Sequence, residues 1–187
     1  LHLSEPLHLS RDSQSWLVWA RNMVMHELIL SNPLRAENLC NLNYCEDGTG
    51  RIRKSERGYE IRLEKHEVKN PHEEKEFGYT GSIGSSANTW LDFYINVVRP
   101  LWPTKLKASE RLFLTDSGMP ISVIELRSIF IRVSSLHLPE FGALNPHAYR
   151  HILSLSQFVG HLGFSPTSGI EGEIIWQKRK LRGHCLH

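Results

Sequence analysis

The stretch of residues 145–151 combines the parts of an anion-binding site within two helical turns. It reads Asn-Pro-His-Ala-Tyr-Arg-His, in which Asn145 is a favoured N-cap and Pro146 suits the first position of a helix. His147 then lies in the first turn and Arg150 one turn later, close to the free N–H groups and the positive end of the helix dipole. Arginine supplies a planar, permanently charged donor and histidine a donor that also moves protons, so the stretch predicts a phosphate-binding site.

A second Asn-Pro helix start occurs upstream. Asn32 is the expected cap, Pro33 the first helical residue, and Arg35 lies inside the first turn. Arg35 would thereby be presented as Arg150 is, and the two starts suit two arms of one phosphate clamp. The alternative is that the two arginines form separate surface ion pairs, because Asn-Pro is a common start signal. The clamp hypothesis predicts that both guanidinium groups converge on one anion.

The elements that must position these residues are mainly helical. Apolar residues recur at positions i, i+3 and i+4, and caps and proline stops bound the segments. One of these starts is a capping box formed by Ser122 and Glu125. The predicted helices cover residues 13–30, 33–42, 89–100, 122–135 and 146–160, with a short last helix over 174–181.

Alternating apolar residues predict a small sheet between the helices. The expected strands are residues 51–54, 59–69 and 76–79, antiparallel and with one solvated face. Lys69 lies at the lip of the hairpin between the second and third strands, where Lys65 and Lys75 compete with it for any role. The predicted fold class is therefore α+β, mainly helical, with a small three-stranded antiparallel sheet.

Length and composition suit one domain. The 187 residues are 40% hydrophobic and 22% charged, which predicts a single globular domain over residues 1–187, with an irregular loop and basic tail at 163–187. No apolar stretch has membrane-spanning length, so we expect an intracellular protein. The three cysteines form no C-x-x-C pair and are expected to be reduced, which argues against a disulfide framework or a zinc ribbon.

Charge is unevenly distributed along the chain. Residues 1–98 carry 11 basic and 14 acidic side chains, whereas residues 99–187 carry 11 basic and 6 acidic ones. A modestly basic second half is compatible with a nucleic-acid partner but does not require one.

The order of these elements, and the motifs within them, resemble the catalytic domain of the tyrosine recombinases, the phage-integrase family. The resemblance covers about residues 13–160. It rests on Asn-Pro-Leu-Arg-x-x-Asn-Leu-x-x-Leu at 32–42, Val-Lys-Asn at 68–70, Arg-Pro-Leu at 99–101, Leu-Phe-Leu-Thr-Asp-Ser-Gly-Met-Pro at 112–120, and the stretch 145–151.

The resemblance implies site-specific DNA recombination or integration by transesterification at a phosphodiester. Arg35 and Arg150 would grip the scissile phosphate, Lys69 would be the general acid of the hairpin, and His147 the histidine of the His-x-x-Arg pair. Trp176 is the best-spaced residue for the family's further His or Trp. The resemblance also implies double-stranded DNA as partner, self-association on DNA, no metal or small-molecule cofactor, and a preceding DNA-binding domain outside this sequence.

The chain departs from the family pattern at the nucleophile. None of the 37 residues from His151 to His187 is a tyrosine, and the five tyrosines that precede Arg150 are expected to be core or sheet residues. Three explanations are open, in this order: the nucleophile lies outside this sequence, the protein is a relative that does not cleave DNA, or Cys185 replaces the tyrosine. Cys185 falls near the place of the missing tyrosine. In addition, Asn38 stands where the family has an acidic residue.

Two other function classes remain open. A DNA-binding module without catalysis would keep the arginines as contacts that position the duplex. A metal-dependent hydrolase is suggested by His147 and His151, four residues apart, and by the His-Cys-Leu-His end at 184–187. The glutamate of an H-E-x-x-H zinc motif is absent, however, so we expect no metal site.

Overall fold

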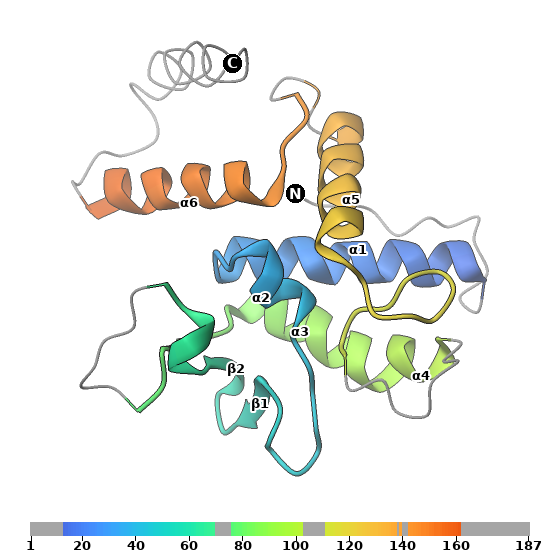
Figure 1. Ribbon diagram of the computed structural model, residues 1–187, viewed down its shortest axis with the longest axis horizontal. Coiled ribbons are helices and arrows are strands. Elements are labelled where there is room, and N and C mark those ends of the chain that lie inside the picture. Colours follow the sequence, from blue (N-terminus) through green and yellow to red (C-terminus); the bar gives the residue numbers. More distant parts are fainter. Residues whose placement is uncertain (1–12, 70–75, 103–110, 138, 140–141, 162–187) are drawn as a thin grey trace.

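The computed structural model describes residues 13–69, 76–102, 111–137, 139 and 142–161, with side chains in the last helix described as far as residue 153 (Figure 1). Helices dominate, with a small sheet at one end. The elements are α1 (Gln14–Ser31), α2 (Ala36–Cys40), β1 (Ile52–Ser55), β2 (Gly58–Leu63), the 3₁₀ turn η1 (Lys65–Glu67), β3 (Tyr79–Ser82), α3 (Ser85–Phe93), the π-helical segment η2 (Tyr94–Val98), α4 (Arg99–Leu101), α5 (Val123–His137) and α6 (Pro146–His161).

Helix α1 is the central element of the core. Ser13 caps it, since its side chain accepts a hydrogen bond from the backbone N–H of Trp16 at 3.3 Å. The helix runs across the middle of the molecule, with α3 on one side and α6 on the other (Figure 1). It is therefore apolar around most of its circumference. Its buried apolar residues are Trp16, Leu17, Ala20, Met23, Val24, Met25, Leu28 and Ile29.

The sheet has the predicted three antiparallel strands, in the order β1-β2-β3. Tyr59, Ile61 and Leu63 of β2 are buried, so the alternation of apolar residues does mark the core-facing side. The predicted strand bounds need two corrections. The second strand ends at Leu63 instead of residue 69, because Glu64 and Glu67 form a capping box that turns the chain into η1. The third strand is Tyr79–Ser82, three residues later than predicted.

Helix α3 continues through η2 into α4. Its aromatic side chains pack edge-on against α1, with ring centroids 5.9 Å apart for both Trp16–Phe93 and Trp19–Trp90. The sequence predicted a helix that starts at residue 89 and stops at Arg99-Pro100. The helix instead starts at Ser85 and runs to Leu101, and a π-helical segment directly precedes Arg99 and Pro100.

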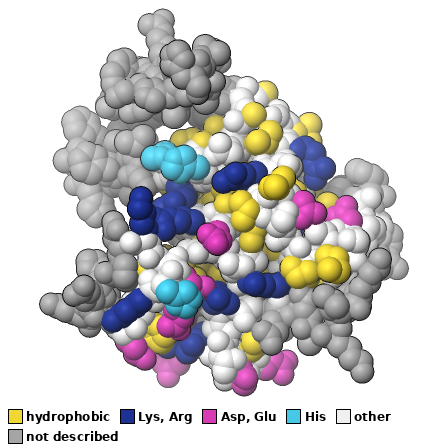
Figure 2. All heavy atoms as spheres, viewed as in Figure 1, with side chains coloured by type: hydrophobic (Ala, Val, Ile, Leu, Met, Phe, Trp, Pro, Cys, Tyr) yellow, Lys and Arg dark blue, Asp and Glu magenta, His cyan; other side chains and the backbone are white. Residues whose placement is uncertain are grey.

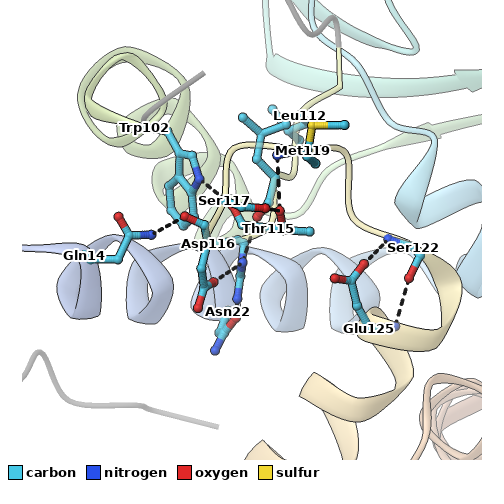
Figure 3. A network of polar contacts seen from close by, with 12 residues as sticks. Gln14, Asn22, Trp102, Leu112, Thr115, Asp116, Ser117, Met119, Ser122 and Glu125 are labelled. Carbon is cyan, nitrogen blue, oxygen red and sulfur yellow. Dashed lines mark hydrogen bonds and ion pairs between the residues drawn. The ribbon is translucent and has the colours of Figure 1, made fainter. Parts of the chain in front are cut away.

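A buried polar network fixes α1 against the segment that leads into α5 (Figure 3). Arg21, in the middle of α1, donates from Nη1 to the carbonyl oxygen of Leu114 at 2.7 Å and to Oδ1 of Asp116 at 3.2 Å. The indole N–H of Trp102 donates to the carbonyl oxygen of Thr115 at 2.9 Å. The buried guanidinium is therefore satisfied by the turn that it supports.

Helix α5 begins as predicted. The backbone N–H of Ser122 donates to Glu125 Oε2 at 2.9 Å and the N–H of Glu125 to Ser122 Oγ at 3.2 Å, which is a complete capping box. Arg127 and Arg132 of this helix are exposed. Within the described ranges, no helix has both the length and the apolar character that a bilayer span requires.

Candidate phosphate-binding site

The first turn of α6 has the predicted cap. Asn145 Oδ1 accepts hydrogen bonds of 3.0 Å from the backbone N–H groups of both His147 and Ala148. The residue before this cap is held by α5, because the backbone N–H of Leu144 donates a 2.7 Å hydrogen bond to the buried Oγ of Ser134. The start of α6, and with it the direction of His147 and Arg150, is thus set by both local and long-range contacts.

Arg150 joins α6 to the segment that follows α1. Its Nε donates a hydrogen bond of 2.8 Å to the carbonyl oxygen of Pro33, which is 117 residues away in sequence. Burial lowers the pKa of Arg150 from its ordinary value, and the positive charge of Arg35 lowers it further. The two arginines that the sequence paired are therefore within electrostatic reach of each other.

The local structure at Arg35 differs from the prediction. It does not lie in the first turn of a helix that starts at Pro33. Helix α2 starts at Ala36, and Arg35 itself is its N-cap residue, in an extended conformation with φ −69° and ψ 151°. The reason is that Asn32 is occupied elsewhere, because it is the C-cap of α1 and its amide donates to the hydroxyl of Tyr79 at 2.9 Å.

The surroundings of Arg35 are those of a half-open cationic site. Its side chain is partly buried, and it makes no hydrogen bond or ion pair within the part of the chain that the structure describes. Two neighbouring guanidinium groups repel each other, and an anion between them would remove that repulsion. Figure 2 shows histidine side chains near the position of α6 beside a group of Lys and Arg side chains. That the two arginines hold a phosphate stays a prediction.

His147 is exposed and contacts a second histidine. Its Nε2 lies 2.9 Å from Nε2 of His151, one turn further along α6, and the two ring planes are 86° apart. The pKa of His147 is lowered by partial desolvation and by the nearby charges of His151 and Arg150. His147 is therefore biased toward its neutral form, in which a ring nitrogen donates a hydrogen bond while the other accepts one.

The other predicted site residues have no described contact with the two arginines. Lys69 is exposed and follows η1, on the connection from β2 to β3 as predicted. In the described ranges, no hydrogen bond or ion pair links it to Arg35 or Arg150. Trp176 and Cys185 lie outside the described residues, as does the basic tail at 163–187.

The sequence did not reveal an aromatic cluster behind Arg150. His26 of α1 is buried and stacks on Phe130 with ring centroids 4.2 Å apart, and Tyr149 packs edge-on against both rings. Among the described residues, the Oη atom of Tyr149 and Nε2 of His26 are buried and have no hydrogen-bond partner. Tyr149 precedes Arg150 in sequence, yet its ring belongs to the core. In the sequence, His26 is one of several polar residues in a mainly apolar helix, and its spacing gives no sign that it packs against Phe130 and Tyr149.

Comparisons with known proteins bear on the fold. No protein-family model and no curated protein sequence matches this chain. Among solved structures the chain is similar to a crystal structure of XerA recombinase, with a TM-score of 0.52 and 16% sequence identity. The match covers 88% of this chain and 54% of the other, so this chain spans about half the length of that protein. The chain thus has the fold of a domain of XerA recombinase, and the predicted fold class and structural resemblance are confirmed.

Proposed function

We propose that this chain is a DNA strand-transferase domain of the recombinase type, whose site binds one backbone phosphate of double-stranded DNA. The observation that carries the proposal is the pair Arg35 and Arg150. Two cationic side chains from distant parts of the sequence lie within electrostatic reach, next to the N-terminus of α6. Such an arrangement is unfavourable by itself and becomes favourable with an anion, which is the charge pattern of a phosphate site.

Each residue has a role in transesterification at a phosphodiester. Arg35 and Arg150 would stabilise the charge that develops on the non-bridging oxygens, and loss of one preorganised donor typically costs about 10²–10³ in rate. His147 would donate a further hydrogen bond, and Lys69 would protonate the leaving oxygen, a contribution of roughly 10²–10⁴. Trp176 would supply the last donor. Site-specific recombination by such chemistry requires two duplexes, so we also expect self-association on DNA.

The second candidate function is DNA binding without cleavage. It is favoured by a specific observation, namely that no tyrosine follows Arg150 in this sequence. Of the earlier tyrosines, Tyr149 is buried against His26, Tyr94 is fully buried, and Tyr59 donates its hydroxyl to Asp92 at 2.8 Å. The two candidates share the phosphate site and differ only in the covalent step.

Fluorescence anisotropy with a labelled duplex tests the shared phosphate site. Binding should weaken steeply with salt, on the order of 10³-fold between low and moderate salt if about six phosphates are contacted. Arg35→Gln should weaken binding and flatten the salt dependence, since one phosphate contact is lost. Arg127→Gln is the matched control, because it removes an equal charge from the exposed face of α5.

The outcomes are distinct. If Arg35→Gln and Arg127→Gln lower the affinity equally, the binding follows net charge alone and the proposed site is wrong. Absence of binding at low salt would also contradict the proposal. A selective effect of Arg35→Gln supports it, whether or not the chain cleaves DNA.

A further inference from the structure

The exposed histidine pair on α6 has the geometry of a chelating site. The Nε2 atoms of His147 and His151 are 2.9 Å apart, and the ring centroids are 4.3 Å apart. Both side chains are exposed, and the residues are separated by one helical turn, so they project from the same face of a regular helix. Their nearest ring nitrogens thus lie within hydrogen-bond distance of each other at the surface of α6.

We infer that His147 and His151 form a binding site for a divalent transition metal of the zinc, nickel or copper type. Imidazole nitrogen is a preferred ligand of these ions, whereas magnesium and calcium prefer oxygen. Two Zn–N bonds of about 2.0–2.1 Å at a tetrahedral angle place the nitrogens roughly 3.3–3.4 Å apart. The rings therefore have to separate by only a few tenths of an ångström. Exposed side chains make such a shift by a small rotation.

The site is incomplete as a protein cage. Among the described residues no group of three or more His, Cys, Asp or Glu side chains could hold a metal ion. The remaining coordination positions would thus be taken by water, which leaves the ion open and its affinity moderate. Arg150 lies on the same helix beside the pair, and its positive charge opposes a cation, which lowers the affinity further.

A metal at this position would change the chemistry of His147. The ion takes the Nε2 lone pairs of both rings, so the hydrogen bond between them is lost and neither Nε2 can carry a proton. This inference does not depend on whether the chain binds DNA.

Isothermal titration of the whole 187-residue chain with ZnCl₂ or NiCl₂ tests the site. Because the terminal His184, Cys185 and His187 also contain ligand atoms, the reference protein carries H184Q, C185S and H187Q together. This reference should still bind one equivalent of metal. His147→Gln or His151→Gln in that background should lower the affinity by about 10-fold or more, because a two-point chelate becomes a single contact. The double variant has neither imidazole and should show no saturable binding at this position.

Controls separate a specific pair from general histidine binding. His66→Gln and His137→Gln remove exposed histidines elsewhere and should leave the affinity unchanged. Thermal unfolding of each variant without metal checks that the fold persists, as expected for exposed positions. Magnesium should not compete. The inference is overturned if the reference protein binds no zinc or nickel, or if His147→Gln and His151→Gln bind the metal as the reference does.

Discussion

Arg150 Nε donates a 2.8 Å hydrogen bond to the carbonyl oxygen of Pro33, only two residues before Arg35. One arginine of the candidate site therefore holds the backbone that carries the other. The guanidinium of Arg150 is in part a structural group, whereas no hydrogen bond or ion pair engages the side chain of Arg35 among the described residues. The two side chains should consequently respond differently to substitution.

Arg35→Gln and Arg150→Gln should separate stability from anion binding. Arg150→Gln removes the bond to Pro33 and should lower the free energy of unfolding by about 1 kcal/mol. Arg35→Gln removes a repelling charge and should leave stability unchanged or slightly higher. Urea denaturation measures both, with Arg127→Gln as a surface control. Equal losses of stability for Arg35→Gln and Arg150→Gln would contradict this division of roles.

The chain should not form a covalent link with DNA. A nicked duplex that traps covalent intermediates should give no protein band shifted by the mass of DNA after denaturation, since the sequence after Arg150 contains no tyrosine. An adduct that disappears in Cys185→Ser would instead assign the nucleophile to the thiol. An adduct that disappears only when one of the five tyrosines is changed to Phe would show that an upstream hydroxyl reaches the phosphate.

Stability should fall as the pH falls from about 6.5 toward 4, in part because of His26. Its Nδ1 donates to the carbonyl oxygen of Asn22 at 2.7 Å, and burial lowers the pKa of the ring to about 4. The unfolded chain therefore binds the proton at a higher pH than the folded chain does. Each pH unit in this window should cost roughly 1.4 kcal/mol, and about 3 kcal/mol in total.

The contribution of His26 can be isolated by comparing slopes. Urea denaturation at several pH values gives the slope of the unfolding free energy between pH 6.5 and 4.5. His26→Gln should reduce this slope by the equivalent of about one proton taken up on unfolding, whatever its effect on stability at pH 7. His147→Gln is the comparison, because the pKa of that exposed ring is also lowered, but its surroundings are mostly water. An unchanged slope in His26→Gln would mean that the core accepts the charged ring.

The hydrogen bonds of Arg21 to Leu114 and Asn22 should contribute more to stability than its ion pair with Asp116 does. Arg21→Met leaves the carbonyl oxygen of Leu114 and the side chain of Asn22 without their donor, and should cost about 1–3 kcal/mol. Asp116→Asn removes only the charge partner, whose side chain is 67% exposed, and should cost less than about 1 kcal/mol. Thermal unfolding of both variants gives the comparison. A larger loss for Asp116→Asn would show that the ion pair dominates.

Local signals were reliable where one turn of chain decides the structure. The cap of Asn145, the capping box of Ser122 and the apolar face of α1 were all predicted, because each depends on neighbours within four residues. Asn32 was misread for the opposite reason. The same Asn-Pro signal occurs there, but a tertiary contact with Tyr79, 47 residues away, decides which helix end Asn32 belongs to. The pairing of Arg35 with Arg150 was proposed from the two Asn-Pro starts, but in the structure the two segments are joined by the hydrogen bond from Arg150 to Pro33, which spans 117 residues and has no local signal.

The contacts of Asn32 join the end of α1 to the third strand. Its amide donates to Tyr79 and to the carbonyl oxygen of Ser82, and a side chain at Gly81 would place its Cβ 2.7 Å from that amide nitrogen. Hydrogen bonds from Asn32 thus join the end of α1 to the third strand, and only glycine at position 81 leaves room for the Asn32 side chain. Asn32 is also only three residues before Arg35, so the same side chain lies between the third strand and the backbone that carries this arginine. The position of Arg35 therefore depends on a side chain outside the candidate site, because Asn32 fixes the chain before Pro33 to the sheet.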